Sequence, residues 1–180
     1  MLHITIPAQE YYDERTETFV NTKEITLTLE HSLVSVSKWE SKWCKPFLSK
    51  DAKTPEETLD YIKCMTLTQN VPPETYNYLT NENISEIKRY IEDPHTATFI
   101  NEGPGGSKSR EVITSELIYY WMTALNIPWE SQKWHLNRLL MLIRVCNVKN
   151  QPKKKMSQRE LMSRNAALNA ARKQKLHSKG

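Results

Sequence analysis

The sequence of 180 residues has only four glycines and three cysteines. So little glycine, without a repeat, excludes a collagen-like chain and a low-complexity linker. Cys44, Cys64 and Cys146 are odd in number and widely spaced, with no CxxC pair and no histidine pair at ligand spacing. They therefore predict neither a disulfide framework nor a zinc site, and we expect three small buried or half-buried thiols.

Long apolar runs are also missing, since no run approaches the roughly 18 residues that a helix needs to cross a bilayer. Residues 1–7 do not combine a basic segment with a long apolar one, so we expect no signal peptide and a location in the cytoplasm of the cell that makes the protein. A body of about 150 residues buries roughly 70% of its unfolded surface, which is enough for a core without disulfides or a structural metal.

Charge is divided unevenly along the chain. Residues 1–150 carry 16 lysines and arginines against 20 acidic residues, a net −4, whereas residues 151–180 carry nine against one, a net +8. Residues 151–155, a Gln-Pro pair followed by three lysines, are typical of a hinge. We predict a globular body over 1–150 and a basic hinge with a helical arm over 151–180. This arm favours an acidic or nucleic-acid partner, or docking on its own body.

The first thirty residues have the pattern of strands. Residues 2–6 and 25–29 alternate apolar and polar side chains with a period of two, and Phe19 and Val20 lie between them. The polar residues 12–15 are typical of a turn. We predict two or three strands in a small antiparallel sheet that packs on helices, because so small a sheet is not stable alone.

From Ser32 onward the period changes to three and four, which predicts helices. The first has an apolar face that we expect in the core, with an exposed aromatic binding stripe as the alternative. That face consists of Leu33, Val36, Trp39 and Trp43, and the other faces carry Ser35, Lys38, Glu40 and Lys42.

Local sequence patterns predict three further helix starts. The capping-box pattern from Thr54 to Glu57 predicts a second helix. The pair at residues 72–73 opens a short third one. Asn81 or Asn83 is expected to cap a fourth, which ends before Pro94.

The middle of the chain combines a loop with two apolar helices. Residues 101–107 hold three of the four glycines and predict the tip of a hairpin between 96–100 and 110–113, without the spacing of a phosphate-binding loop. Residues 114–147 predict two helices joined by a short link that ends at Pro128. The second, apolar on most sides, is expected to run from Pro128 as the buried central helix of a mainly α (α+β) fold.

The arm itself predicts a helix that opens with a capping box at Ser157 and ends near Leu176. Its apolar content is thin, so the helix is marginal alone and is expected to order on a partner. The candidate partner-binding residues are the basic ones: Lys153, Lys154, Lys155, Arg159, Arg164, Arg172, Lys173 and Lys175.

No pattern in the sequence predicts catalysis, a cofactor or a metal. His135 has Glu130 five residues before it, a spacing that does not bring two groups together on a helix, so we expect a half-buried histidine hydrogen-bonded at a helix junction. Nucleic acid is the less favoured partner of the arm, because the arm has no aromatic residues and the chain has no helix-turn-helix, zinc-finger or RRM signature.

Three stretches nevertheless resemble a family. LEHSL to WESKW (29–43), YYWM to WHLNRLL (119–140) and SRNAALNAAR (163–172) resemble tail assembly chaperones of long-tailed, siphovirus-like bacteriophages. The resemblance covers nearly the whole chain. It implies a protein of the host cell cytoplasm that binds the tape measure protein while tail tube subunits polymerise around it, and it implies no active site.

The resemblance leaves alternatives open. Many such chaperones are made in two lengths by ribosomal frameshifting, and residues 153–155 are candidates for an A-rich slippery run. A virion structural protein of the tail or connector, whose arm orders against neighbouring subunits, is the second hypothesis. A nucleic-acid-binding protein is the third, and a homo-oligomer also stays open.

Overall fold

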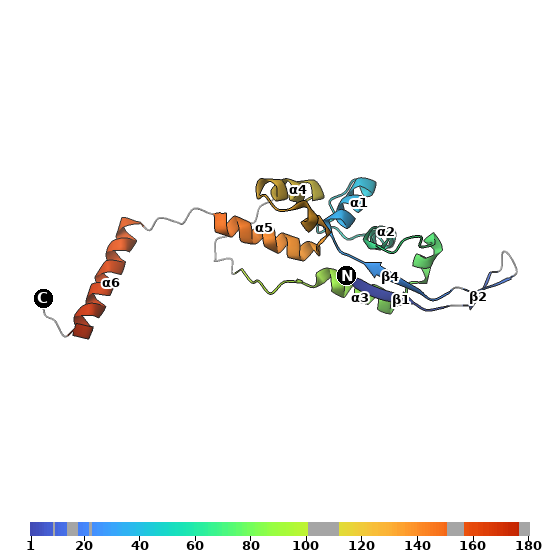
Figure 1. The fold of residues 1–180 in the computed structure, drawn as a ribbon, viewed down its shortest axis with the longest axis horizontal. Coiled ribbons are helices and arrows are strands. Elements are labelled where there is room, and N and C mark those ends of the chain that lie inside the picture. Colours follow the sequence, from blue (N-terminus) through green and yellow to red (C-terminus); the bar gives the residue numbers. More distant parts are fainter. Residues whose placement is uncertain (9, 14–17, 22, 101–111, 151–156, 177–180) are drawn as a thin grey trace. The chain divides into compact units, whose positions relative to one another are not determined.

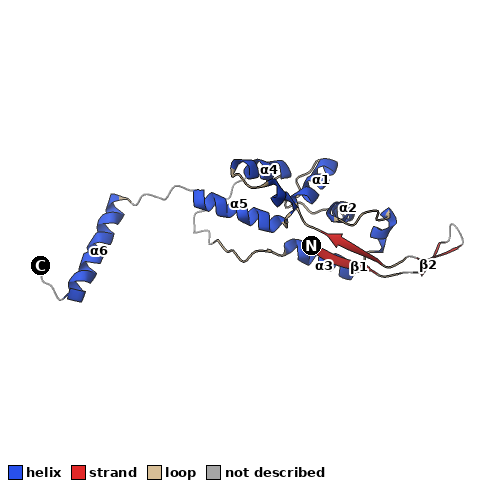
Figure 2. Cartoon of the chain, viewed as in Figure 1, coloured by secondary structure: helices blue, strands red, loops and turns tan. Residues whose placement is uncertain are grey.

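A computed structural model describes residues 1–8, 10–13, 18–21, 23–100, 112–150 and 157–176. The chain forms two compact units, Met1–Asn147 and Val148–Gly180, which are described separately. Helices dominate, and the described strands all lie near the N-terminus (Figure 1, Figure 2). The predicted class, mainly α with a small N-terminal antiparallel β part, is therefore confirmed.

The first strand pair lies in the core of the first unit. Strand β1 (Leu2–Ile6) pairs antiparallel with β4 (Ile25–Leu29), with Ile4 opposite Leu27. The alternating pattern holds, because the buried side chains are Ile4, Ile6, Leu27 and Leu29. The other edge of β4 is paired as well, since the chain after the second helix donates from Leu67 N to Thr28 O over 2.8 Å.

A second antiparallel pair joins β2 (Glu10–Asp13) and β3 (Thr18–Asn21). The two or three strands predicted as one sheet are thus four strands in two pairs. The turn expected over residues 12–15 was wrong at its start, because Tyr12 and Asp13 belong to β2 and pair with Phe19 and Thr18.

Helix α1 (Leu33–Trp43) buries one face in the core of the first unit. Ser32 caps it, and Leu33, Val36 and Trp39 face the core, as their spacing predicts. Placing Ser35 and Glu40 on outer faces was wrong, since both are buried. Each is satisfied by the backbone, with Ser35 Oγ donating to Glu30 O over 2.8 Å and Glu40 accepting from backbone N–H groups.

Three elements follow α1, each with a local start signal. Helix α2 (Pro55–Met65) has the predicted Thr54–Glu57 capping box. The segment η1 (Pro73–Tyr78) is a 3₁₀ helix. Helix α3 (Asn81–Glu92) lies along β1 (Figure 1). The predicted cap of α3 was wrong: Thr80 is the N-cap, and its backbone N–H donates to Asn83 Oδ1 over 3.2 Å.

The single helix predicted from Pro128 was wrong. A 3₁₀ segment, η2 (Trp129–Lys133), is separated from α5 (Leu136–Asn150) by two extended residues. Leu136 N donates to His31 O over 2.7 Å and His135 forms a β-bridge with Ser32, so pairing with a remote segment interrupts the helix. Helix α5 enters the core through Leu136, Leu139 and Ile143, while its C-terminal residues are exposed.

Helix α4 (Ser115–Ala124) packs on α1, and its Ile118 and Met122 side chains are buried in the core. The hairpin predicted before it was not found in the part that the structure describes. Residues 96–100 and 112–113 are not strands, and the expected tip falls among residues 101–111, outside the described residues. Cys44 is exposed, contrary to expectation, whereas Cys64 and Cys146 are half-buried.

In the second unit, helix α6 (Gln158–Leu176) begins with the predicted capping box. Ser157 N donates to Glu160 Oε2 over 2.9 Å, and Glu160 N donates to Ser157 Oγ over 3.2 Å. The predicted end near Leu176 is confirmed. The predicted domain boundary lies after residue 150, whereas the two compact units divide after Asn147, within the last turn of α5.

Candidate partner-binding site

Every residue of α6 is exposed, including its large apolar ones. Leu161 is 45% exposed, Leu168 47% and Met162 69%. Alanines supply the intrinsic helix preference, with Ala166, Ala167, Ala170 and Ala171 all in the middle of the helix. The helix is therefore formed locally and leaves its leucines exposed, which makes its apolar side chains a candidate contact surface.

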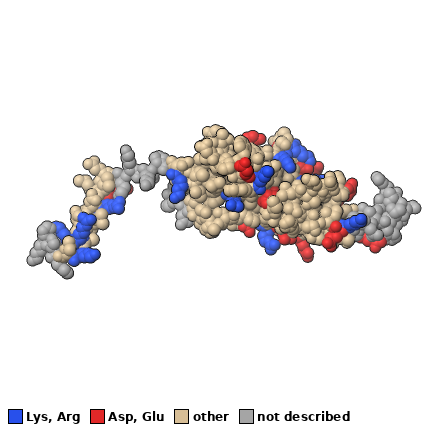
Figure 3. All heavy atoms as spheres, viewed as in Figure 1, with Lys and Arg blue, Asp and Glu red and all other residues tan. Residues whose placement is uncertain are grey.

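The leucines and several basic residues of α6 fall on one side of the helix. Steps of three and four residues connect Leu161, Arg164, Leu168, Arg172 and Lys175, and such steps keep side chains on one face. Ser163, Ala166 and Ala170 fall on the opposite side. Blue spheres of lysine and arginine mark the basic residues of α6 in Figure 3. The face combines apolar contact with positive charge, which the net charge of the arm did not reveal.

The predicted arm residues are only partly placed by the structure. Arg159, Arg164, Arg172, Lys173 and Lys175 lie on α6, and three of them share the leucine face. Lys153, Lys154 and Lys155 lie outside the described residues.

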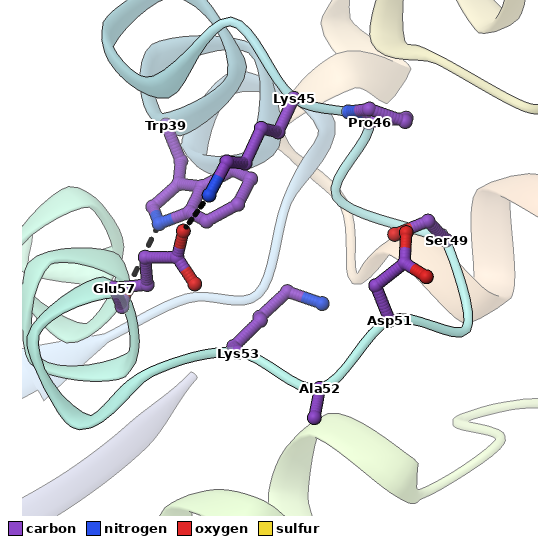
Figure 4. A pocket seen from close by; sticks show the side chains of 8 residues that line it. All are labelled: Trp39, Lys45, Pro46, Ser49, Asp51, Ala52, Lys53 and Glu57. Atoms are coloured by element: carbon purple, nitrogen blue, oxygen red, sulfur yellow. Dashed lines mark hydrogen bonds and ion pairs between the residues drawn. The ribbon is translucent and has the colours of Figure 1, made fainter.

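A pocket of about 340 Å³ lies in the first unit, where the loop between α1 and α2 folds over Trp39 (Figure 4). Its residues are Trp39, Lys45, Pro46, Ser49, Asp51, Ala52, Lys53 and Glu57. Lys45 Nζ is 2.6 Å from Glu57 Oε1, and the Trp39 indole N–H donates to Glu57 O over 2.9 Å. These bonds fix one wall of the pocket.

Two charged groups of this pocket have displaced pKa values. Hydrogen bonds from Lys45 and from the Thr54 backbone N–H lower the pKa of the Glu57 carboxyl. Burial lowers the pKa of the Lys53 ammonium, and the attraction of Glu57 and Asp51 does not offset it. Lys53 Nζ donates to Phe47 O over 2.7 Å and lies 4.4 Å from the centre of the Phe47 ring. Sequence reasoning missed Lys53, because no local pattern marks it.

Histidines gather at the junction of η2 and α5, which sequence reasoning only half predicted. His135 is bonded there as expected but is buried, and its ring contacts His31 and His95. His31 bonds to the hydroxyl of Tyr61, and both side chains are buried. Burial, with His135 and His95 nearby, lowers the pKa of His31 to about 3. Within the described residues, no group of three His, Cys, Asp or Glu side chains is placed to hold a metal ion.

Comparison with protein-family models, with curated proteins and with solved structures found no match to this chain. No helix in the described ranges is both long enough and apolar enough to cross a membrane.

Proposed function

We propose that the protein is a tail assembly chaperone of a long-tailed phage, which binds the tape measure protein through its C-terminal arm. The observation that supports this proposal most is the exposed face of α6, on which Leu161 and Leu168 alternate with basic side chains. The sequence resemblance of residues 29–43, 119–140 and 163–172 supplies the identity of the partner.

The geometry of this face suits a helical partner. Leu161 and Leu168 are seven residues apart, the repeat that keeps two packed helices in register. Arg164, Arg172 and Lys175 flank them and would pair with carboxylates on the partner. Because Leu161 and Leu168 are about half exposed, burying what remains of the two side chains supplies roughly 1.5–3 kcal/mol before the cost of ordering the partner is subtracted. Binding of this size is reversible, as a chaperone that later releases its client requires.

The test is co-expression of the tape measure protein with the full chain or its variants. With the unaltered chain, the soluble fraction of the tape measure protein should rise severalfold. The double variant Leu161→Ser/Leu168→Ser should lose that gain, whereas Ala166→Ser/Ala170→Ser, on the opposite side of α6, should keep it. The proposal is contradicted if the leucine variant raises the soluble fraction of the tape measure protein as much as the unaltered chain does, or if the unaltered chain does not raise it.

Mass spectrometry of purified particles separates the proposal from a structural role in the virion. An assembly chaperone should be absent or scarce relative to tail tube subunits. A fixed stoichiometry in the particle would instead identify a tail or connector component.

A further inference from the structure

A second cavity, of about 320 Å³, lies between α2 and α3 in the first unit. The residues that line it are Lys53, Pro55, Thr58, Leu59, Ile62, Ile84 and Lys88, and we call it the α2–α3 groove. Leu59 and Ile84 are half-buried, so the groove reaches the surface. Lys53 also borders the pocket of Figure 4, so this lysine lies between two hollows of the body.

The groove has an apolar floor. From α2, Pro55, Leu59 and Ile62 line the groove, with Ile62 buried in the core and Leu59 half-buried at its edge. Ile84 faces them from the first turn of α3. Half-buried aliphatic side chains around a hollow are the usual setting for an apolar anchor from a partner.

The charged residues that line the groove have one sign. Lys53 and Lys88 line it, and no acidic residue does. Within the described ranges, Lys53 is the one lysine that is half-buried while the others are exposed, and no carboxylate lies within 4.0 Å of its Nζ. Its Nζ donates to a neutral carbonyl, that of Phe47. Glu57 and Asp51 attract this ammonium from the side of the Figure 4 pocket, but neither forms an ion pair with it, so an incoming anion would stabilise the partly desolvated charge.

We propose that the α2–α3 groove binds a segment of a partner protein that presents a large apolar side chain beside carboxylates, as an acidic amphipathic helix does. The apolar side chain would occupy the hollow between Leu59 and Ile84. The carboxylates would meet Lys53 and Lys88. This surface belongs to the body, and the proposal does not depend on what the arm binds.

The lining favours an acidic peptide over other anions. Nucleic acid would need aromatic side chains for base stacking, and the groove lining has none. A fatty acid would need a hollow long enough for its chain, whereas a volume of about 320 Å³ that reaches the surface suits about one or two side chains.

The test uses a fluorescein-labelled synthetic helical peptide of about 18 residues with leucine and glutamate on one face, and a matched peptide with lysine for glutamate. Fluorescence anisotropy with the full chain should show binding of the glutamate peptide and at least tenfold weaker binding of the lysine peptide. Lys88→Glu should weaken the glutamate peptide about tenfold, and Lys53→Gln should act in the same direction.

Matched variants locate the binding. Lys133→Gln removes an exposed lysine outside the groove and should leave the peptide affinity unchanged. Arg172→Gln/Lys175→Gln alters the arm and should also leave it nearly unchanged. Lys88 is exposed, so Lys88→Glu should fold normally even if Lys53→Gln does not.

Three results would contradict peptide binding in the α2–α3 groove. The first is an affinity of the Lys88→Glu variant equal to that of the unaltered chain, and the second is loss of binding in the arm variant alone. The third is displacement of the peptide by dodecanoate but not by excess unlabelled glutamate peptide. None of them bears on the solubility assay with the leucine variant of α6, so failure of the groove and failure of the chaperone proposal remain distinguishable.

Discussion

His135 donates a hydrogen bond from Nε2 to the backbone carbonyl of Tyr90, over 3.0 Å. Its Nδ1 accepts from the backbone N–H of Asn137, whose own amide donates to the carbonyls of Ile91 and Asp93. The start of α5 therefore satisfies the carbonyl groups at the end of α3. His135 can donate from one ring nitrogen and accept at the other only in its neutral form. Burial together with the nearby His95 lowers its pKa, which favours that form.

The histidine junction predicts a stability that declines in mild acid. Burial holds the pKa of His31 at about 3, against an ordinary value of 6.5, so below pH 6.5 the unfolded chain binds a proton that the folded chain does not. The free energy of unfolding should therefore be largest, as far as His31 is concerned, above pH 6.5. It should fall as the pH decreases toward 3, by up to about 1.4 kcal/mol per pH unit for each such histidine. Urea unfolding between pH 7.5 and 5 measures this slope.

Two variants assign the slope to His31. His31→Gln should be less stable at pH 7.5 but should show a shallower loss between pH 7.5 and 5. Tyr61→Phe removes the hydroxyl that bonds His31 and leaves the histidine buried, so it should lower stability by about 1 kcal/mol and keep the steep slope. An unchanged slope in His31→Gln would show that other groups cause the acid sensitivity.

Glu40 is predicted to be one of the most sensitive polar positions. Its carboxylate accepts from Phe47 N and from Ser115 N, each over 2.7 Å, and so joins the α1–α2 loop to the start of α4. Glu40→Ala leaves two buried N–H groups without an acceptor, which should cost about 2–5 kcal/mol. Glu40→Gln keeps one acceptor oxygen, so its stability should lie between those of the unaltered chain and Glu40→Ala. Urea unfolding at pH 7.5 provides the values.

The matched control is Glu116→Gln, which changes an exposed carboxylate next to Ser115. It should alter stability by no more than about 0.5 kcal/mol. Equal losses from Glu40→Ala and Glu116→Gln would mean that the general charge of this region, not the two buried bonds, is responsible.

Features set by neighbouring residues could be predicted from the sequence. The capping boxes at Thr54 and Ser157 and the alternating strands around Ile4 and Leu27 were all anticipated, because their signals span a few residues. The break before α5 was not, because its cause is pairing of His135 with Ser32, far away in the chain. The burial of Glu40 was hidden for the same reason, since its partners come from two other segments.

The candidate sites divide in the same way. The basic arm was predicted from composition alone, and the helical periodicity of α6 adds the shared face of Leu161 and Leu168. The α2–α3 groove had no sequence signal, because Lys53 and Lys88 come together only when α2 and α3 are placed. Sites built by tertiary structure from scattered residues of ordinary type lie beyond local patterns.

The same capping motif occurs in both units, which allows a matched pair of substitutions. Thr54→Ala removes the cap of α2, a helix that contributes to the core, and should lower the free energy of unfolding by about 1 kcal/mol. Ser157→Ala removes the cap of α6, which has no buried residue, and should reduce far-ultraviolet helicity while leaving the main unfolding transition in place. A shift of that transition in Ser157→Ala would mean that α6 supports the fold of the body.

Removal of residues 151–180 should leave the fold of the body intact. The buried hydrophobic residues of the described chain run from Ile4 to Ile143, and α6 buries none. A chain ending at Asn150 should therefore unfold in urea within about 0.5 kcal/mol of the full chain, while losing the gain in solubility of the tape measure protein. It should still bind the glutamate peptide, because the α2–α3 groove is complete without the arm. A loss of several kcal/mol would show instead that the arm stabilises the body, and the leucine face of α6 would then need a role within the fold.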